Sequence, residues 1–116
     1  TPEGIENVEE IVTTPGLTGV YIGPSDLALA LGLPAYGDQP QEEHLETVKH
    51  ILAICKKHGV VSGMHTSSLE YTKKYLDLGF NMVMLGSDSA FMMRTAGKEL
   101  AEAKEAIVES GESTGY

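Results

Sequence analysis

The sequence predicts an α/β fold in which helices cover a parallel sheet. Three short apolar runs, over residues 19–22, 60–64 and 81–85, lack the regular polar alternation of a half-exposed strand. Stretches with apolar residues at helical spacing separate these runs, and Gly or Pro residues bound them. One helix followed by three strand-helix units is the order typical of a parallel sheet with helical connections.

Each element follows from a local signal. Ile5, Val8 and Val12 recur at helical spacing and predict a first helix over residues 3–13, which Pro15-Gly16 ends. The remaining predicted elements are a strand over 19–22, a short helix over 27–31, a loop over 32–40, a helix over 41–58, a strand over 60–64, a helix over 68–78, a strand over 81–85 and a helix over 88–109. Gly59 is expected to cap the C-terminus of the second long helix.

Each predicted strand leads into a small-residue turn that carries a polar group. The three turns are Gly23-Pro24-Ser25-Asp26, Gly63-Met64-His65-Thr66 and Gly86-Ser87-Asp88. This repetition resembles the rim of a (β/α)8 barrel, where the loops after the strands gather at one face. Because a three-stranded parallel sheet leaves two edges open, the chain should belong to a larger barrel or pair with other copies.

Composition and charge narrow the choice of partners. Seventeen acidic and eight basic residues give this 116-residue chain a formal net charge of -9. That charge argues against nucleic acid or an anionic membrane surface as a partner, and no apolar run approaches the roughly 20 residues of a membrane span. The single Cys55 lies in a helical pattern and is expected to be a buried thiol. We expect a globular protein of the cytoplasm, whose start at Thr1 indicates a piece of something longer.

Asp26 is the first candidate for chemistry. It follows a rigid Gly23-Pro24 turn just past a predicted strand, and ligands of α/β proteins collect at the carboxyl ends of strands. Two interpretations are open on this pattern: a metal ligand or polar anchor, and a cap of the following helical turn. The local pattern alone favours the cap.

A resemblance to a known family changes that balance. The segments that carry it are Glu6–Ile11, Gly19–Leu27, Tyr75–Phe80 and Leu85–Asp88. They resemble the metal-dependent (class II) pyruvate aldolases of the 4-hydroxy-2-oxoheptanedioate and 2-keto-3-deoxyglucarate type, which are citrate-lyase-like members of the phosphoenolpyruvate/pyruvate barrel superfamily. The resemblance covers nearly the whole chain and implies the C-terminal part of a (β/α)8 TIM barrel, with residues 1–110 as a partial barrel domain and 111–116 as a flexible tail.

The resemblance also implies a site and a reaction. Asp26 would bind a divalent cation (Mg²⁺, Mn²⁺ or Co²⁺), a hard ion that prefers carboxylate and substrate oxygens. Gly23, Pro24, Ser25 and Asp26 would hold the carboxylate of pyruvate, and His65 would line the substrate pocket. The implied reaction is the reversible cleavage of a 4-hydroxy-2-oxo acid into pyruvate and an aldehyde, with the cation as Lewis acid.

The isolated chain is nevertheless expected to be inactive. In the family, the second metal carboxylate, a substrate-binding Arg and a His-Asp pair precede the residue that matches Thr1. An alternative is a non-catalytic half-barrel module that assembles through its open sheet edges with itself or another fragment. In either case we expect a homo-oligomer, with residues 88–109 as a candidate exchanged helix. A lyase acting on an acyl-CoA thioester is a further possibility, although no residue selects for CoA.

Other reactive side chains have structural explanations. His44 and His50 do not share a helix face, which excludes an i,i+4 metal pair, and His58 should complement the dipole of its helix. Asp88 should act as an N-cap. The acidic residues of the first helix should form a solvated face: Glu3, Glu6, Glu9 and Glu10. The methionines should pack in the core: Met64, Met82, Met84, Met92 and Met93.

Overall fold

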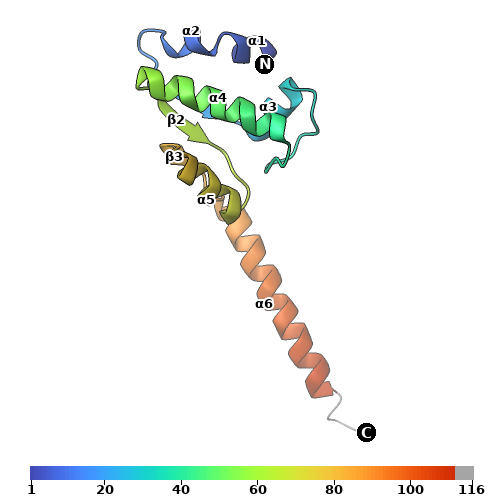
Figure 1. Cartoon of the computed structure of the whole chain (residues 1–116). Helices are drawn as coiled ribbons and strands as arrows, with labels where there is room; N and C mark the ends of the chain where they lie inside the picture. Colours follow the sequence, from blue (N-terminus) through green and yellow to red (C-terminus); the bar gives the residue numbers. More distant parts are fainter. Residues whose placement is uncertain (112–116) are drawn as a thin grey trace. The chain divides into compact units, whose positions relative to one another are not determined.

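A computed structural model describes the backbone of residues 1–111 and the side chains of residues 1–105. Its internal contacts divide the chain into a first unit, Thr1–Leu85, and a second unit that begins at Gly86. Figure 1 shows the order of the elements along the chain. Residues 112–116, most of the predicted flexible tail, lie outside the described residues.

The first unit is an open three-stranded sheet with helical connections. Its elements are α1 (Pro2–Glu6), α2 (Val8–Val12), β1 (Gly19–Ile22), α3 (Pro24–Ala30), α4 (Glu42–His58), β2 (Val61–Met64), α5 (Leu69–Leu78) and β3 (Met82–Val83). The strands are parallel in the order β1-β2-β3, with Tyr21 opposite Gly63 and Met64 opposite Val83. The predicted α/β class and the parallel sheet are therefore confirmed.

The predicted first helix over 3–13 is in fact two short helices. Asn7 interrupts it: its backbone leaves the helical region at φ -100° and ψ 16°, and its side-chain amide donates to the carbonyl of Glu3 at 2.8 Å. Asn side chains that bond to nearby carbonyls compete with the helical pattern, which explains the break. Val8 and Val12 remain buried on the inner side of α2, which lies beside α4 (Figure 1).

The sheet has one buried face and one exposed face within this unit. Ile22, Ser62 and Met64 are buried on the side where α4 packs. On the other face, Tyr21, Val61 and Met82 are 48%, 43% and 54% exposed. The expected helical cover of the sheet is therefore present on one face only, because residues 1–85 supply no layer over Tyr21, Val61 and Met82.

The core forms between α4, α5 and the buried sheet face. Val48, Leu52 and the free thiol of Cys55 project from one side of α4, and burial raises the pKa of Cys55. Tyr75 packs edge-on against Phe80, with ring centroids 5.6 Å apart. Burial of Tyr75 raises its pKa to about 12. The buried thiol predicted for Cys55 is thus confirmed.

Glycines end both long helices of the unit. Gly59 and Gly79 adopt left-handed conformations at φ 67° and φ 95°, and their amides bond to carbonyls of the preceding turns. A glycine has no Cβ to oppose this conformation, so each chain segment can turn directly into the next strand. The cap predicted at Gly59 is confirmed.

The described part of the second unit contains helix α6 (Asp88–Gly111). Ser87 caps it by accepting a hydrogen bond from the amide of Ala90 at 3.2 Å, so the N-cap predicted at Asp88 is wrong by one residue. Met92 and Met93 are 67% and 71% exposed, and Met82 in the first unit is exposed as well, so the predicted packing role is confirmed for Met64 but not for these three.

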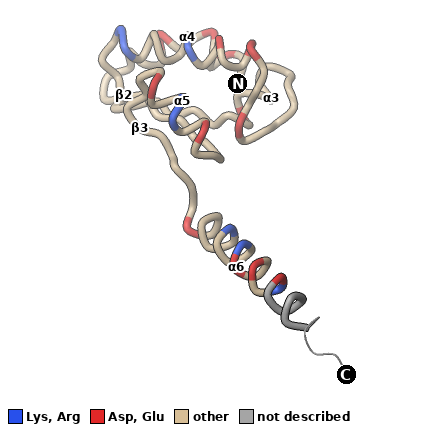
Figure 2. Tube along the Cα trace, turned by 60° about the horizontal axis from the view of Figure 1, so that its bottom comes forward, with Lys and Arg blue, Asp and Glu red and all other residues tan. Residues whose placement is uncertain are grey.

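Figure 2 shows acidic and basic positions interspersed along α4 and α6. Among the described helices, none combines the length and apolarity that crossing a membrane requires.

Candidate functional site

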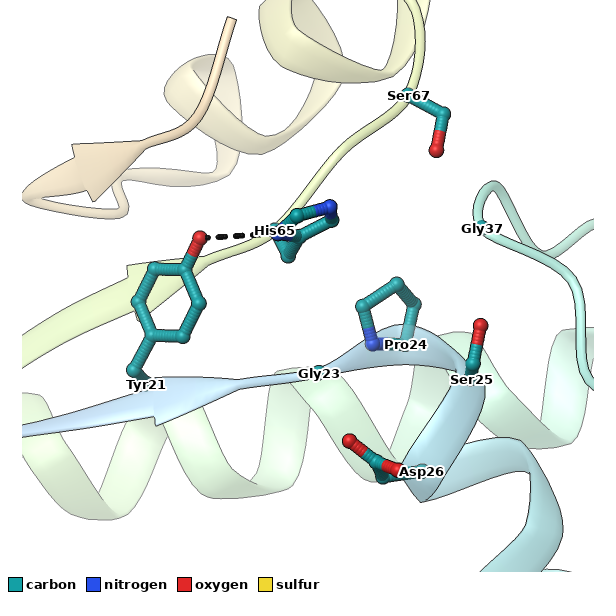
Figure 3. Close-up of a pocket in the computed structure, with 8 residues that line it drawn as sticks. All are labelled: Tyr21, Gly23, Pro24, Ser25, Asp26, Gly37, His65 and Ser67. Atoms are coloured by element: carbon teal, nitrogen blue, oxygen red, sulfur yellow. Dashed lines mark hydrogen bonds between the residues drawn. The ribbon is translucent and has the colours of Figure 1, made fainter. Parts of the chain in front are cut away.

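A pocket of about 510 Å³ opens at the carboxyl ends of β1 and β2 (Figure 3). Eight residues line it: Tyr21, Gly23, Pro24, Ser25, Asp26, Gly37, His65 and Ser67. All five residues that the sequence singles out as substrate or metal ligands are among them. Tyr21, Gly37 and Ser67 were not predicted. Gly37 lies in the loop after α3 and Ser67 in the segment after β2, and only folding brings these two segments beside β1, which carries Tyr21.

Asp26 lies in the first turn of α3, and its side chain is exposed. It is not the cap of that helix, because Gly23 occupies the N-cap position and Pro24 begins the helix. Within the described residues, no donor forms a hydrogen bond with its carboxylate. The carboxylate lies close to Gly23, where a Cβ atom would approach Asp26 Oδ2 to 2.7 Å. Glycine at position 23 therefore leaves the space that the Asp26 side chain occupies.

Two hydrogen bonds hold the loop between α3 and α4 over the pocket. The Ser25 hydroxyl donates to the carbonyl of Tyr36 at 3.1 Å, and the Ser67 amide donates to Asp38 Oδ1 at 2.9 Å. Between these anchors, a Cβ atom at Gly37 would overlap the Ser67 hydroxyl. The loop is thus attached to the helix start on one side and to the segment after β2 on the other.

Tyr21 and His65 form a polar pair on the pocket wall. The Tyr21 hydroxyl lies 3.3 Å from His65 Nδ1, and the two rings meet edge to face at 89°. Gly63 allows this contact, because a Cβ there would come within 2.6 Å of the Tyr21 ring. Tyr21 is the next-to-last residue of β1, and no pattern in the sequence marked it as a site residue.

His44, on α4, supports the turn Gly23-Pro24-Ser25-Asp26. It is fully buried, and its Nε2 atom lies 3.1 Å from the carbonyl oxygen of Pro24. Desolvation lowers the pKa of His44, although the hydrogen bond to Pro24 opposes the shift. The sequence held a signal for this role, because His44 shares the helical stripe of Val48, Ile51 and Cys55.

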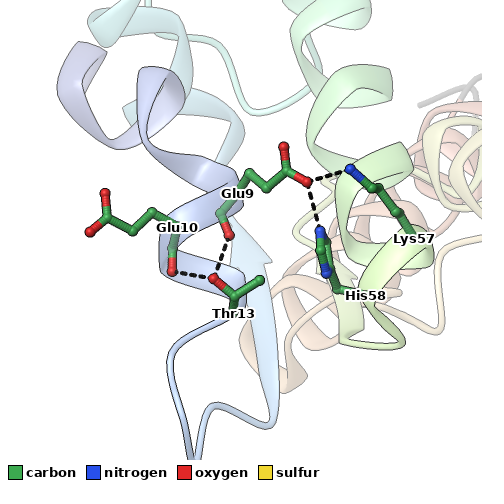
Figure 4. A network of polar contacts seen from close by, with 5 residues as sticks. All are labelled: Glu9, Glu10, Thr13, Lys57 and His58. Carbon is green, nitrogen blue, oxygen red and sulfur yellow. Dashed lines mark hydrogen bonds and ion pairs between the residues drawn. The ribbon is translucent and has the colours of Figure 1, made fainter.

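A separate polar network joins α2 to the end of α4 (Figure 4). Glu9 Oε1 accepts from Lys57 Nζ at 2.5 Å and pairs with His58 Nε2 at 2.8 Å. The hydrogen bond from Lys57 is the main cause that lowers the pKa of Glu9 to about 2, and His58 adds to it. The prediction that Glu9 only forms part of a solvated acidic face is therefore incomplete, because it pairs with Lys57 and His58. His58 lies in the last turn of α4, as predicted, and also contacts this carboxylate.

The residues that line the pocket supply one ligand for a hard cation and do not form a complete coordination sphere. Asp26 supplies a free carboxylate, the donor type that Mg²⁺ and Mn²⁺ prefer. Among the described residues, no three His, Cys, Asp or Glu side chains come together as a metal-binding group. Of the eight residues that line the pocket, Asp26 is the one that carries a carboxylate.

The sequence profile of the HpcH/HpaI aldolase/citrate lyase family matches residues 1–96. The chain belongs to this family. The resemblance inferred from Gly19–Leu27 and the other quoted segments is thereby confirmed.

Several known proteins are similar to this chain over most of its length. It is 40% identical over 100 residues to 5-keto-4-deoxy-D-glucarate aldolase of Klebsiella pneumoniae subsp. pneumoniae, which covers 86% of this chain and 38% of the relative. A crystal structure of an HpcH/HpaI family protein from Burkholderia cenocepacia J2315 superposes with a TM-score of 0.80 at 28% identity, over 87% of this chain and 38% of the other. The structure of the citrate synthase SbnG superposes with a TM-score of 0.75 at 25% identity, over 90% and 42%.

The chain spans about 38% of the length of the curated relative and of the Burkholderia structure. Its three strand-helix units correspond to part of a TIM-barrel aldolase structure, as the strand-end turns predicted. In such a barrel the carboxyl ends of the strands form the face that carries active sites. The pocket beside Asp26 lies at that end of β1 and β2.

Proposed function

We propose that this chain is the C-terminal, metal- and pyruvate-binding part of a class II aldolase. The whole enzyme would reversibly cleave a 4-hydroxy-2-oxo acid into pyruvate and an aldehyde. The observation that carries the proposal is the free carboxylate of Asp26, which lies over Gly23 on the wall of a pocket at the carboxyl end of β1. The family membership and the name of the Klebsiella relative, an aldolase of a keto-deoxy sugar acid, support the reaction class.

The backbone of the same turn suits the carboxylate of a 2-oxo acid. Amides in the first turn of a helix have no intrahelical acceptor, and Ser25 and Asp26 occupy that turn of α3. Pro24 and Gly23 set its direction, while the Ser25 hydroxyl is occupied by the Tyr36 carbonyl. An anion can therefore be bound here without a Lys or Arg, in a chain of net charge -9.

Asp26 would hold a divalent cation, Mg²⁺, Mn²⁺ or Co²⁺, together with the substrate. When bound, such an ion supplies Lewis-acid chemistry toward the oxygens of a 2-oxo acid. This chain contributes one carboxylate, the turn amides and the pocket wall with His65. Because one carboxylate binds a hard cation weakly, we expect the isolated chain to have no aldolase activity.

Two measurements on the purified chain test this proposal. Mn²⁺ should broaden the amide NMR signals around Asp26, and Asp26→Asn should abolish the effect. Asp77→Asn, which changes an exposed carboxylate on α5, is the matched control and should leave the broadening intact. Broadening that persists in Asp26→Asn contradicts the proposed metal ligand. Turnover of a 4-hydroxy-2-oxo acid by the chain, abolished by EDTA and by Asp26→Ala, contradicts the expected inactivity.

A second candidate function is a half-barrel module that assembles through its sheet. β1 and β3 are edge strands, and the sheet face with Tyr21, Val61 and Met82 is exposed. Exposed edges and apolar faces favour association with a copy of the chain or with another fragment. Light scattering distinguishes the cases, because a defined oligomer supports assembly and a monomer at high concentration contradicts it. A tight oligomer that is lost when residues 88–109 are deleted would identify α6 as the exchanged element.

A further inference from the structure

The carboxylate of Asp26 takes its position from the backbone of its turn. Within the described residues no donor forms a hydrogen bond with this carboxylate, which lies close to Gly23 (Figure 3). Its direction therefore follows from the conformation of the turn and from what holds the turn in place. A metal ligand must be held to within about 0.5 Å of its productive position. The attachments of the turn thus decide how well Asp26 can serve as a ligand.

Two side-chain hydrogen bonds attach the turn to other segments. The Ser25 hydroxyl donates to the carbonyl of Tyr36 at 3.1 Å, in an exposed position on the loop after α3. His44 Nε2 lies 3.1 Å from the carbonyl oxygen of Pro24, and both of these residues are buried. Because water competes with an exposed hydrogen bond and not with a buried one, the contact of His44 is the firmer attachment.

The partner of His44 fixes where its imidazole carries a proton. A peptide carbonyl can only accept a hydrogen bond, so Nε2 is the donor. In the neutral ring Nδ1 is then an acceptor, and within the described residues this buried atom has no hydrogen-bond partner. A buried acceptor without a partner costs at least as much free energy as a neutral hydrogen bond typically returns. Stability therefore does not account for a histidine in the apolar stripe of α4.

We propose that His44 is a positioning residue for the cation site, and that through the carbonyl of Pro24 it holds the turn in the orientation in which Asp26 binds a divalent cation. This inference rests on the proposed function, which makes Asp26 a metal ligand. It adds that the affinity of Asp26 for the cation depends on a buried donor of α4. Partners that orient a metal ligand typically change metal affinity by roughly 10- to 100-fold. Because His44 acts through a residue two positions before Asp26, we expect the lower end of this range.

Three substitutions at position 44 separate the donor from the ring. His44→Leu fills the apolar stripe without a donor, His44→Gln places an amide donor at a reach similar to that of Nε2, and His44→Asn carries the same amide on a shorter side chain. NMR titration with Mn²⁺, read at the amides around Asp26, measures the dissociation constant. We expect about tenfold weaker binding in His44→Leu and His44→Asn, and restored affinity in His44→Gln. His50→Leu, at an exposed position of α4, is the control and should leave the affinity unchanged.

A stability measurement distinguishes positioning from a general effect on folding. His44→Leu removes the unpaired Nδ1 together with the bond to Pro24, so its urea midpoint should be close to that of His44→Gln although it binds Mn²⁺ more weakly. A merely structural role would make affinity and midpoint fall together across the variants, and that result overturns the inference. Equal Mn²⁺ affinity in the unmodified chain, His44→Leu and His44→Gln also overturns it and leaves the proposed function intact.

A further measurement decides the inference without a cation. Residual dipolar couplings of the Ser25 and Asp26 amides report the orientation of the turn relative to α4 in the metal-free chain. His44→Leu should change these couplings, and His44→Gln should keep the values of the unmodified chain. Unchanged couplings in His44→Leu overturn the inference whether or not Mn²⁺ binds. Failure of the Mn²⁺ test at Asp26 in the unmodified chain separately overturns the proposed function.

Discussion

His44 Nε2 lies 3.1 Å from the carbonyl oxygen of Pro24, so a buried side chain of α4 holds the turn that carries Asp26. The bond joins the first turn of α4 to the first turn of α3, across the loop that closes the pocket. His44 is fully buried and is not among the residues that line the pocket, so it supports the site through its contact with Pro24.

Replacing His44 should destabilise the first unit. His44→Ala removes a buried ring and leaves the Pro24 carbonyl with one partner fewer, so we expect the free energy of unfolding to fall by about 2 to 3 kcal/mol. His50→Ala, an exposed position on the same helix, should change it by less than about 0.5 kcal/mol. Urea unfolding followed by circular dichroism measures both. Equal losses in the two variants would show that the bond to Pro24 contributes nothing specific.

Protonation of His44 should destabilise the fold as the pH falls. Burial holds its folded pKa below the ordinary value of 6.5, so the unfolded chain takes up this proton first. Stability from this group is fully present above pH 6.5 and is lost as the pH falls from 6.5 toward the folded pKa. Urea midpoints measured from pH 8 to pH 5 should show this loss, which should be smaller in His44→Gln. A ring NMR titration that gives His44 a pKa of 6.5 or higher would contradict the account.

Glu9 should titrate well below an ordinary glutamate. Its folded pKa of about 2, against an ordinary 4.5, arises from Lys57 and His58. Its contribution to stability is therefore present above pH 4.5 and is lost as the pH falls from 4.5 through about 2. A carboxyl ¹³C titration should show the low value, and 1 M NaCl should raise it because the group is solvent-exposed. Lys57→Ala should raise the pKa of Glu9 toward its ordinary value, and an unchanged pKa in that variant would contradict the network.

Gly23→Ala should disturb the site without unfolding the chain. A methyl group would approach Asp26 Oδ2 to 2.7 Å, and the Asp26 side chain can avoid it by rotating away. We expect the Mn²⁺ effect around Asp26 to weaken by about tenfold or more, as for a misplaced ligand. Gly97→Ala is the control, because nothing lies within 4 Å of its Cβ position. In an exposed helix that change should stabilise α6 slightly. Unchanged Mn²⁺ binding in Gly23→Ala would show that the close contact does not control Asp26.

Local patterns in the sequence were sufficient for most of the fold. The strand Gly19–Ile22, the glycine cap at Gly59 and the buried Cys55 follow from short-range propensity and apolar spacing. Such patterns failed where side chains compete with the backbone. Asn7 splits the first helix through its bond to Glu3, and Ser87 takes the cap expected of Asp88.

The residues of the candidate site also form two groups, those that the sequence identified and those that it did not. Gly23-Pro24-Ser25-Asp26 could be identified because it is one continuous turn after a strand, and His65 because it ends the next strand. Tyr21, Gly37 and Ser67 could not, since each joins the site through a neighbour more than 20 residues away along the chain. The apolar stripe of α4 indicates that His44 is buried, but that spacing does not specify its contact with Pro24.

The sequence by itself determined the order of helices and parallel strands and the acidic turn after the first strand, because these depend on neighbours along the chain. Only the tertiary structure decided that Tyr21 reaches His65 and that His44 holds Pro24. Those contacts depend on the register of β1 with β2 and on the packing of α4, which no spacing along the chain specifies.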